Sequence, residues 1–189
     1  MKRENLQKLT VSAMMIALST ALSFIPVFEM PMGGSITLFS MVPVCMIAIM
    51  YDTKWGLCCG ALYGFIQMFL GFKNLSYGTW WGAVVAIILF DYIVAFMMLG
   101  FSGVFKKVIK NRYVAIISGI ALSCFLRFLC HFITGVTVWR EIADIWGAVW
   151  YSVSYNGTYM LPELVITIAG ACLLYKTETI NRLINKIIK

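Results

Sequence analysis

Long apolar stretches recur along the whole chain, and short segments that hold charges, prolines and glycines separate them. A helix that crosses a bilayer needs about 20 apolar residues. The pattern predicts six such helices, over residues 6–25, 36–51, 55–72, 80–105, 113–138 and 158–175. We therefore expect an all-α integral membrane protein in which residues 1–189 form a single transmembrane domain.

Two of the segments between these helices have turn chemistry. The first predicted helix ends at Pro26, and a predicted loop follows over residues 27–35, with Glu29 among its residues. Asn156-Gly157 is typical of a turn. We expect this pair to lead into the last helix, with Asn156 as the cap of that helix.

Composition and charge agree with a membrane location. Of the 189 residues, 61% are hydrophobic and 12% are charged, against roughly 25% charged in a soluble domain. The net charge of +7 does not indicate nucleic acid binding, because Lys and Arg stand at the ends of the predicted helices and there set topology. With the N-terminus inside, the outer loops hold only Lys73 and Arg140 of these residues. Both termini are therefore expected in the cytoplasm.

Common metal and enzyme motifs are missing from the sequence. The six cysteines form no CxxC pair and the chain has one histidine, so no Cys/His zinc site is expected. There is no HExxH, no serine nucleophile elbow, no Walker A sequence and no dinucleotide fingerprint. We therefore expect no metal and no catalytic activity.

Three ionisable side chains lie inside predicted helices: Asp91, Arg127 and His131. A charge at bilayer depth costs at least about 2.5–3.5 kcal/mol, so it normally faces a cavity or a partner. Arg127 and His131 are four residues apart and share one helix face. His131 lies roughly 11 Å below the outer end of its helix at a rise of 1.5 Å per residue. The three residues predict a polar pocket that opens to the outside.

Other roles for these ionisable groups are compatible with the sequence. Arg127 could pair with Asp91 or Glu163 and hold helices together. Asp91 and His131 could instead act as an acid/base pair or a proton relay in a membrane enzyme or a proton-coupled carrier. A purely structural assembly subunit is a third possibility, but it gives no reason for three ionisable groups at similar depth.

Aromatic and polar side chains gather between residues 139 and 163. They are Trp139, Trp146, Trp150, Tyr151, Tyr155, Asn156, Tyr159 and Glu163. An aromatic belt at the membrane interface explains any one of the Trp and Tyr residues. Together with Asp91 and His131, the group suits a flat, cationic, nitrogen-rich ligand. Aromatic faces attract a cation by roughly 0.5–2 kcal/mol, and a carboxylate neutralises its charge.

Small residues repeat at four-residue spacing in two predicted helices. They are Ala13, Ala17 and Ala21 in the first helix and Gly56, Gly60 and Gly64 in the third. Such stripes let helices approach closely in lipid. Spacing alone favours packing within the bundle and contact with another subunit equally.

Four segments carry a resemblance to a known family. They are residues 30–43 (MPMGGSITLFSMVP), 91–96 (DYIVAF), 127–135 (RFLCHFITG) and 151–163 (YSVSYNGTYMLPE). Over nearly its whole length, the chain resembles the thiamine-specific substrate-binding (S) components of energy-coupling factor (ECF) transporters. The resemblance implies a six-helix, multi-pass protein of a prokaryotic plasma membrane, which captures thiamine with high affinity in an outward-facing pocket. An S component for another vitamin or for a thiamine precursor is the alternative within this class.

The resemblance also implies site residues and partners. The positions that match the family's thiamine contacts are Asp91, Tyr92, His131, Trp139, Tyr151 and Asn156. Arg127 and Glu163 are expected to support the site, and Ala13 and Ala17 match the stripe that docks the coupling module. The implied partners are a transmembrane coupling protein and two cytoplasmic ATPases. These partners use the ATP, so the chain itself is expected to need no cofactor.

Overall fold

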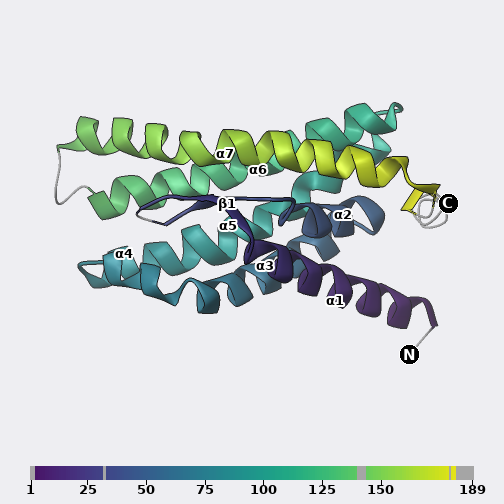
Figure 1. Ribbon diagram of the computed structural model, residues 1–189, viewed down its shortest axis with the longest axis horizontal. Coiled ribbons are helices and arrows are strands. Elements are labelled where there is room, and N and C mark those ends of the chain that lie inside the picture. The colour runs from purple at the N-terminus through teal and green to yellow at the C-terminus, as the bar shows by residue number, and fades with distance from the viewer. Residues whose placement is uncertain (1–2, 32, 140–143, 179, 182–189) are drawn as a thin grey trace.

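The structure, a computed structural model, describes residues 3–31, 33–139, 144–178 and 180–181. The described residues form an elongated helical bundle with one short β-hairpin (Figure 1). The α-helices are α1 (Arg3–Ser23), α2 (Val42–Met50), α3 (Thr53–Leu70), α4 (Trp81–Ala86), α5 (Val94–Met97), α6 (Arg112–Trp139) and α7 (Ile145–Lys176). The strands are β1 (Pro26–Glu29) and β2 (Ser35–Thr37), and the other helical segments are η1 (Phe72–Tyr77), η2 (Ile87–Ile93) and η3 (Met98–Lys107).

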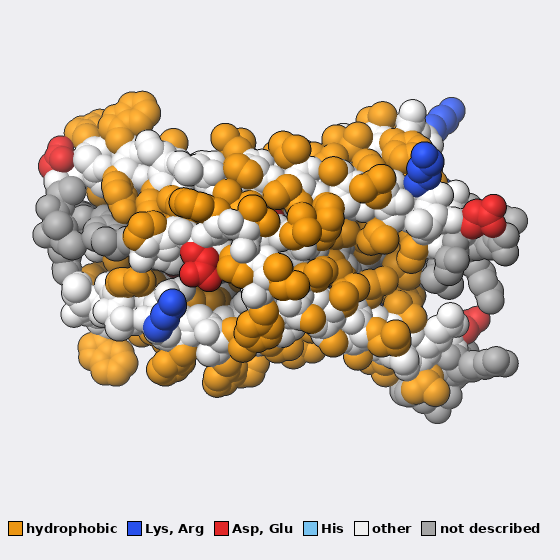
Figure 2. Space-filling view, viewed as in Figure 1, with side chains coloured by type: hydrophobic (Ala, Val, Ile, Leu, Met, Phe, Trp, Pro, Cys, Tyr) orange, Lys and Arg blue, Asp and Glu red, His pale blue; other side chains and the backbone are white. Residues whose placement is uncertain are grey.

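Four helical stretches of the described residues are long and apolar enough to cross a membrane. By length and composition these are Glu4–Ser23, Trp81–Lys107, Arg112–Val138 and Ile145–Lys176. Hydrophobic side chains cover most of the face seen in Figure 2, which is the surface that lipid contact requires. The helical class and a membrane location with several spanning helices are therefore confirmed.

The helix predicted over residues 36–51 is wrong in extent. Its first residues form β2, and α2 has only 9 residues, all of them buried. At 1.5 Å per residue such a helix covers about half of a bilayer core of about 30 Å. A continuous apolar run has the same appearance in a short buried helix as in a spanning one, so the sequence could not separate the two.

The segment predicted as a loop over residues 27–35 is partly a hairpin. Strands β1 and β2 pair antiparallel, with Phe28 opposite Ile36. Gly33 and Gly34 take φ values of 90° and 85°, which only glycine adopts without strain. These two glycines therefore make the turn that folds β2 back along β1.

The last helix begins earlier than predicted. Helix α7 starts at Ile145, where Asp144 caps it by accepting a hydrogen bond from the Gly147 N–H at 3.1 Å. Asn156 and Gly157 consequently lie inside a regular helix, so the predicted turn and the cap at Asn156 are wrong. A well-placed aspartate cap and the continuous apolar face of α7 outweigh a local turn preference.

The glycine stripe of α3 packs inside the bundle. A Cβ atom on Gly60 would lie 2.5 Å from the Phe96 carbonyl oxygen, and one on Gly64 would lie 2.5 Å from the Tyr92 carbonyl oxygen. These glycines thus let α3 lie directly against the backbone of η2 and α5. By contrast, Ala13 and Ala17 of α1 are exposed. The glycine stripe of α3 therefore packs within the bundle, whereas Ala13 and Ala17 of α1 lie on its surface.

Basic side chains tie several helix ends together at one end of the bundle. Lys8 Nζ lies 3.0 Å from Asp52 Oδ2, which joins α1 to the start of α3. Lys106 donates to the carbonyl oxygens of Ile49, at 3.2 Å, and Tyr51, and so gives a partner to carbonyls at the C-terminal end of α2. Helix α1 begins and helix α7 ends at this same end (Figure 1).

Candidate ligand-binding pocket

A cavity of about 390 Å³ lies between the hairpin, η1, η2, α6 and α7. This volume falls within the range of about 300–1,000 Å³ that is usual for small-molecule sites. Seven predicted residues line the cavity: Asp91, Tyr92, Arg127, His131, Tyr151, Asn156 and Glu163. The side chain of Trp139, also predicted as a contact, is outside the part of the chain that the structure describes.

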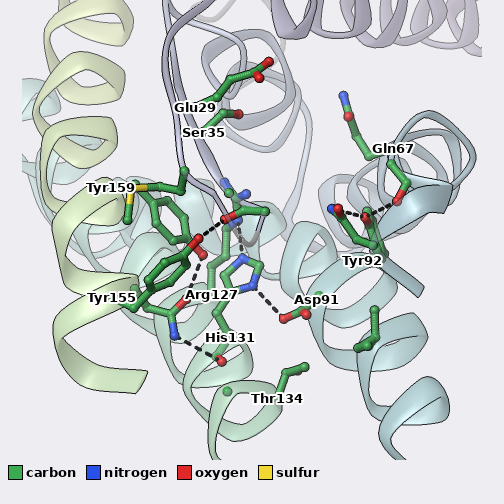
Figure 3. A pocket seen from close by; sticks show the side chains of 18 of the residues that line it. Glu29, Ser35, Gln67, Asp91, Tyr92, Arg127, His131, Thr134, Tyr155 and Tyr159 are labelled. Atoms are coloured by element: carbon green, nitrogen blue, oxygen red, sulfur yellow. Dashed lines mark hydrogen bonds and ion pairs between the residues drawn. The ribbon is translucent and has the colours of Figure 1, made fainter. Parts of the chain in front are cut away.

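A chain of three polar side chains crosses the pocket from α6 to η2 (Figure 3). Arg127 Nε donates to His131 Nε2 at 3.2 Å, and His131 Nδ1 lies 2.8 Å from Asp91 Oδ1. A guanidinium can only donate, so Nε2 must accept, and Nδ1 carries the proton that is donated to Asp91. His131 is thus a neutral imidazole with both nitrogens engaged, and its side chain lines the cavity.

The predicted ion pair between Arg127 and Asp91 or Glu163 is wrong. Within the described residues Arg127 has neither partner within ion-pair distance, because His131 stands between it and Asp91. Instead, the guanidinium carbon lies 4.3 Å from the centre of the Phe96 ring. Arg127 also donates to the sulfur of Met41. The arginine therefore supports the site through His131 and an aromatic face.

Asp91 and Tyr92 lie on η2, a segment of π-helix. Neighbouring residues of a helix normally point about 100° apart, yet both of these side chains line the same cavity. Wide turns of this type are rare and occur frequently at functional sites. The Tyr92 hydroxyl donates to the Gly71 carbonyl at 2.9 Å and accepts from Asn74 Nδ2 at 3.0 Å. Tyr92 thereby fixes η1 against η2.

Asn156 joins α7 to α6 rather than facing the cavity with a free amide. Its Nδ2 donates to the carbonyl oxygens of Ser152, at 2.9 Å, and His131, at 3.3 Å. Its Oδ1 accepts from the Tyr159 hydroxyl at 2.9 Å. A ligand must therefore replace or extend these bonds in order to contact Asn156.

Tyrosines form one wall of the pocket along α7. The rings of Tyr151 and Tyr155 stack with their centres 5.5 Å apart, and Tyr159 continues the series. The Tyr155 hydroxyl donates to the Gly33 carbonyl at 2.8 Å, which joins this wall to the turn of the hairpin. The wall offers aromatic surface opposite the carboxylate of Asp91 (Figure 3).

Two residues that line the pocket, Thr37 and Asn74, were not predicted from the sequence. Glu163 Oε1 accepts from the N–H of Thr37 at 2.8 Å and from its hydroxyl at 2.6 Å. Asn74 lines the other side of the cavity. Thr37 and Asn74 lie outside the long helices, so no helical spacing relates them to Asp91 or His131.

A helical membrane protein with a polar and aromatic pocket inside its bundle is a membrane-embedded small-molecule binder, and the comparisons with known proteins agree. The chain belongs to the family described as Thiamine transporter protein (Thia_YuaJ), whose model matches residues 9–182. It is 33% identical over 159 residues to "Thiamine transporter ThiT" of Bacillus subtilis (strain 168), covering 79% of each chain.

A solved structure of ThiT from Listeria monocytogenes is similar over almost the whole fold. The TM-score is 0.74 at 27% sequence identity, and the match covers 96% of this chain and 99% of that one. The relatives are named as transporters, so the expectation that the chain is no enzyme is confirmed.

Proposed function

We propose that this chain captures thiamine with high affinity and delivers it for ATP-driven uptake as the S component of an ECF transporter. The observation that carries the proposal is the cavity in which the Asp91 carboxylate faces the tyrosine wall of α7. Thiamine is flat and cationic at its thiazolium ring, and its amino group is a hydrogen-bond donor. A carboxylate and aromatic faces are complementary to such a ligand.

The proposed contacts are the ones named from the resemblance. Asp91 neutralises the cation or accepts from its amino group, while Tyr92, His131, Trp139, Tyr151 and Asn156 complete the site. Arg127 acts as a positioning residue, because it holds the imidazole of His131 through Nε2. Names of relatives from two bacteria support thiamine as the substrate.

We further propose that the pocket opens to the outside and that both termini are cytoplasmic. Lys8, Lys106 and Arg112 lie at the end of the bundle where α1 begins and α7 ends. Lys and Arg concentrate on the cytoplasmic side of membrane proteins. The exposed Glu29 and Lys73 line the cavity at the far end of α3, away from this basic end.

The exposed alanines of α1 are evidence that a coupling protein binds to this helix. Ala13 and Ala17 are small exposed residues of α1. Larger apolar residues of the same helix, such as Met14 and Leu18, are exposed beside them. Small residues let another helix approach closely in lipid. We assign this face to the transmembrane coupling protein, which in turn binds two cytoplasmic ATPases.

Titration of the purified protein with thiamine, followed by tryptophan fluorescence, tests the binding step. We expect saturable quenching with one site per chain, and competition by the pyrimidine half or the thiazole half of the ligand. His131→Ala should weaken binding strongly. Cys58→Ser, an exposed position on α3 outside the pocket lining, should not change it. Absence of saturable quenching by thiamine would overturn the proposal.

Uptake assays separate this mechanism from a proton-coupled carrier. We expect thiamine uptake to stop when the ATPases of the coupling module are inactivated by substitution, and to continue when the proton gradient is collapsed while ATP is maintained. Uptake that survives without ATP hydrolysis but needs the proton gradient would instead establish the carrier.

A further inference from the structure

Four polar contacts join α1 to α3 in an almost constant register. The pairs are Lys8 with Asp52, Ser12 with Trp55, Ser19 with Tyr63 and Ser23 with Gln67, and the partners are 44, 43, 44 and 44 positions apart. Because both residue numbers rise together from pair to pair, α1 and α3 run in the same direction. We call this series of contacts the α1–α3 ladder, and each pair a rung.

Helix α1 depends on the ladder because little else holds it. Among the four spanning stretches of the described residues, α1 has the smallest buried share. Lipid provides no hydrophobic force between helices, so close packing and interhelical hydrogen bonds must hold them together. Ser12 and Ser19 are buried on the inner face of α1, while Ala13 and Ala17 are exposed. A change in the ladder therefore shifts the exposed face as well.

The last two rungs reach the cavity. Ser23, Tyr63 and Gln67 belong to the cavity lining, whereas both residues of the first two rungs do not. Gln67 Nε2 donates to the Tyr63 hydroxyl at 2.8 Å and to Ser23 Oγ at 2.9 Å (Figure 3 shows Gln67 at the pocket). The Tyr63 hydroxyl lies 3.3 Å from the Ser19 carbonyl, to which it donates. Gln67 thus ties the pocket wall to α1 with both of its amide hydrogens.

A second series of contacts leads from the Asp91 side of the pocket to Tyr63. The Tyr63 ring meets the Phe96 ring edge-on, with the centres 5.0 Å apart. The Arg127 guanidinium lies 4.3 Å from the centre of the same Phe96 ring. Arg127 in turn donates to His131, which contacts Asp91. Packed side chains and hydrogen bonds of this kind are the physical means by which two sites are coupled.

We propose that Gln67 and Tyr63 relay occupation of the pocket to α1, so that thiamine changes how tightly the face with Ala13 and Ala17 binds the coupling protein. The inference rests on the proposed function, which supplies both the ligand and the partner. A ligand in the cavity packs against Gln67 and engages Asp91, and so acts on both routes to Tyr63. It thereby alters the strength of the last two rungs and the preferred position of α1. Gln67 and Tyr63 are positioning residues, because they act on the partner through α1.

The coupling is measured as a ratio of two Kd values. They are the Kd of the protein for the purified coupling module in lipid nanodiscs, with and without saturating thiamine. We expect this ratio to differ from one by at least about fivefold in the parent. Gln67→Leu removes both amide donors at similar volume, and Ser23→Ala removes one acceptor. Each should bring the ratio closer to one by about threefold, the average effect of an interhelical hydrogen bond in a membrane protein.

Ser12→Ala is the matched control. Ser12 Oγ accepts from Trp55 Nε1 at 2.9 Å in a rung between the same two helices, but neither residue lines the cavity. Ser12→Ala and Ser23→Ala each remove one serine hydroxyl from the inner side of α1, so both should lower the unfolding temperature by a similar amount. Only Ser23→Ala should change the coupling ratio. A ladder with a merely structural role would change the ratio equally in both variants.

Linkage provides an independent measurement of the same coupling. The Kd for thiamine of the protein bound to the coupling module must differ from that of the free protein by the same factor. A parent ratio of one, a parental ratio in Ser23→Ala, or an equal change in Ser12→Ala overturns the inference. Ser23→Ala decides the test by itself if Gln67→Leu does not fold. Failure of the parent to bind thiamine or the coupling module would overturn the proposed function instead.

Discussion

The imidazole Nδ1 of His131 lies 2.8 Å from Oδ1 of Asp91, although the two residues are 40 positions apart in the chain. Arg127, one turn below His131, donates to the opposite ring nitrogen. The three groups thus form one directed series, in which the guanidinium polarises the imidazole and the imidazole fixes the carboxylate. Linked hydrogen bonds of this kind are stronger together than singly, because each polarises the next.

Asp91→Asn tests whether the charge of this carboxylate binds the ligand. The amide oxygen can still accept from His131 Nδ1, so the series of hydrogen bonds is kept while the negative charge is lost. We expect thiamine affinity to fall by about 10- to 100-fold, since hydrogen bonds to charged groups contribute about 1.5–3 kcal/mol. Isothermal titration calorimetry measures the change. An unaltered Kd would mean that the cation is neutralised elsewhere.

Alanine substitutions at two glycines should have opposite effects on stability. A Cβ on Gly60 meets the backbone of Phe96, whereas one on Gly157 meets no atom within 4 Å. Gly60→Ala should lower the free energy of unfolding by about 1–3 kcal/mol through overpacking. Gly157→Ala should raise it by up to about 1 kcal/mol through helix propensity. Thermal unfolding of the detergent-solubilised protein compares the two, and equal effects would contradict the assigned packing.

Asp52 gives the contact between α1 and α3 a dependence on pH. Partial burial opposes ionisation, but the Trp55 N–H and the Lys8 ammonium outweigh it and hold the pKa of Asp52 below its usual value. Because the folded-state pKa is depressed, the stabilisation is complete above the unfolded pKa of about 3.9. It is lost as the pH falls through the lower folded value.

The size of this effect is limited by exposure. The side chain of Asp52 is 51% exposed, so the contribution should stay below about 1 kcal/mol. The difference in unfolding temperature between the parent and Asp52→Asn should shrink as the pH falls below about 4. A difference that stays constant with pH would show that ionisation of Asp52 does not stabilise the fold.

Bulky substitutions on α1 should separate transport from binding. Ala13→Leu and Ala17→Leu enlarge an exposed face, and neither position belongs to the pocket lining. We expect thiamine uptake by cells to fall at least about tenfold, since misfitting methylenes at a close helix contact cost 1–3 kcal/mol, while the Kd of the purified protein stays the same. Val165→Leu, on an exposed position of α7, is the control. Normal uptake in both alanine variants would move the docking face elsewhere.

Several site residues could be predicted because ionisable residues inside apolar helices are easily recognised in the sequence, and burying them costs free energy. Asp91 and His131 interrupt apolar helices, and a group that is expensive to bury needs a partner or a cavity. Their mutual contact follows from that need. Arg127 shows where prediction from charge fails. Its charge predicted a carboxylate partner, but in the structure it contacts the imidazole of His131 and the ring of Phe96. Opposite charges indicate attraction but not which neighbour lies closer.

By itself, the sequence determined the membrane location, the helical class and the set of costly polar groups, because all of these depend on local composition and periodicity. Only the tertiary structure decided that α2 is short and that Asn156 lies within a helix. It also decided that Glu163 and Asn74 line a common cavity. Those features depend on which distant segments meet, and pairing between segments is set by packing of the whole bundle rather than by any local pattern.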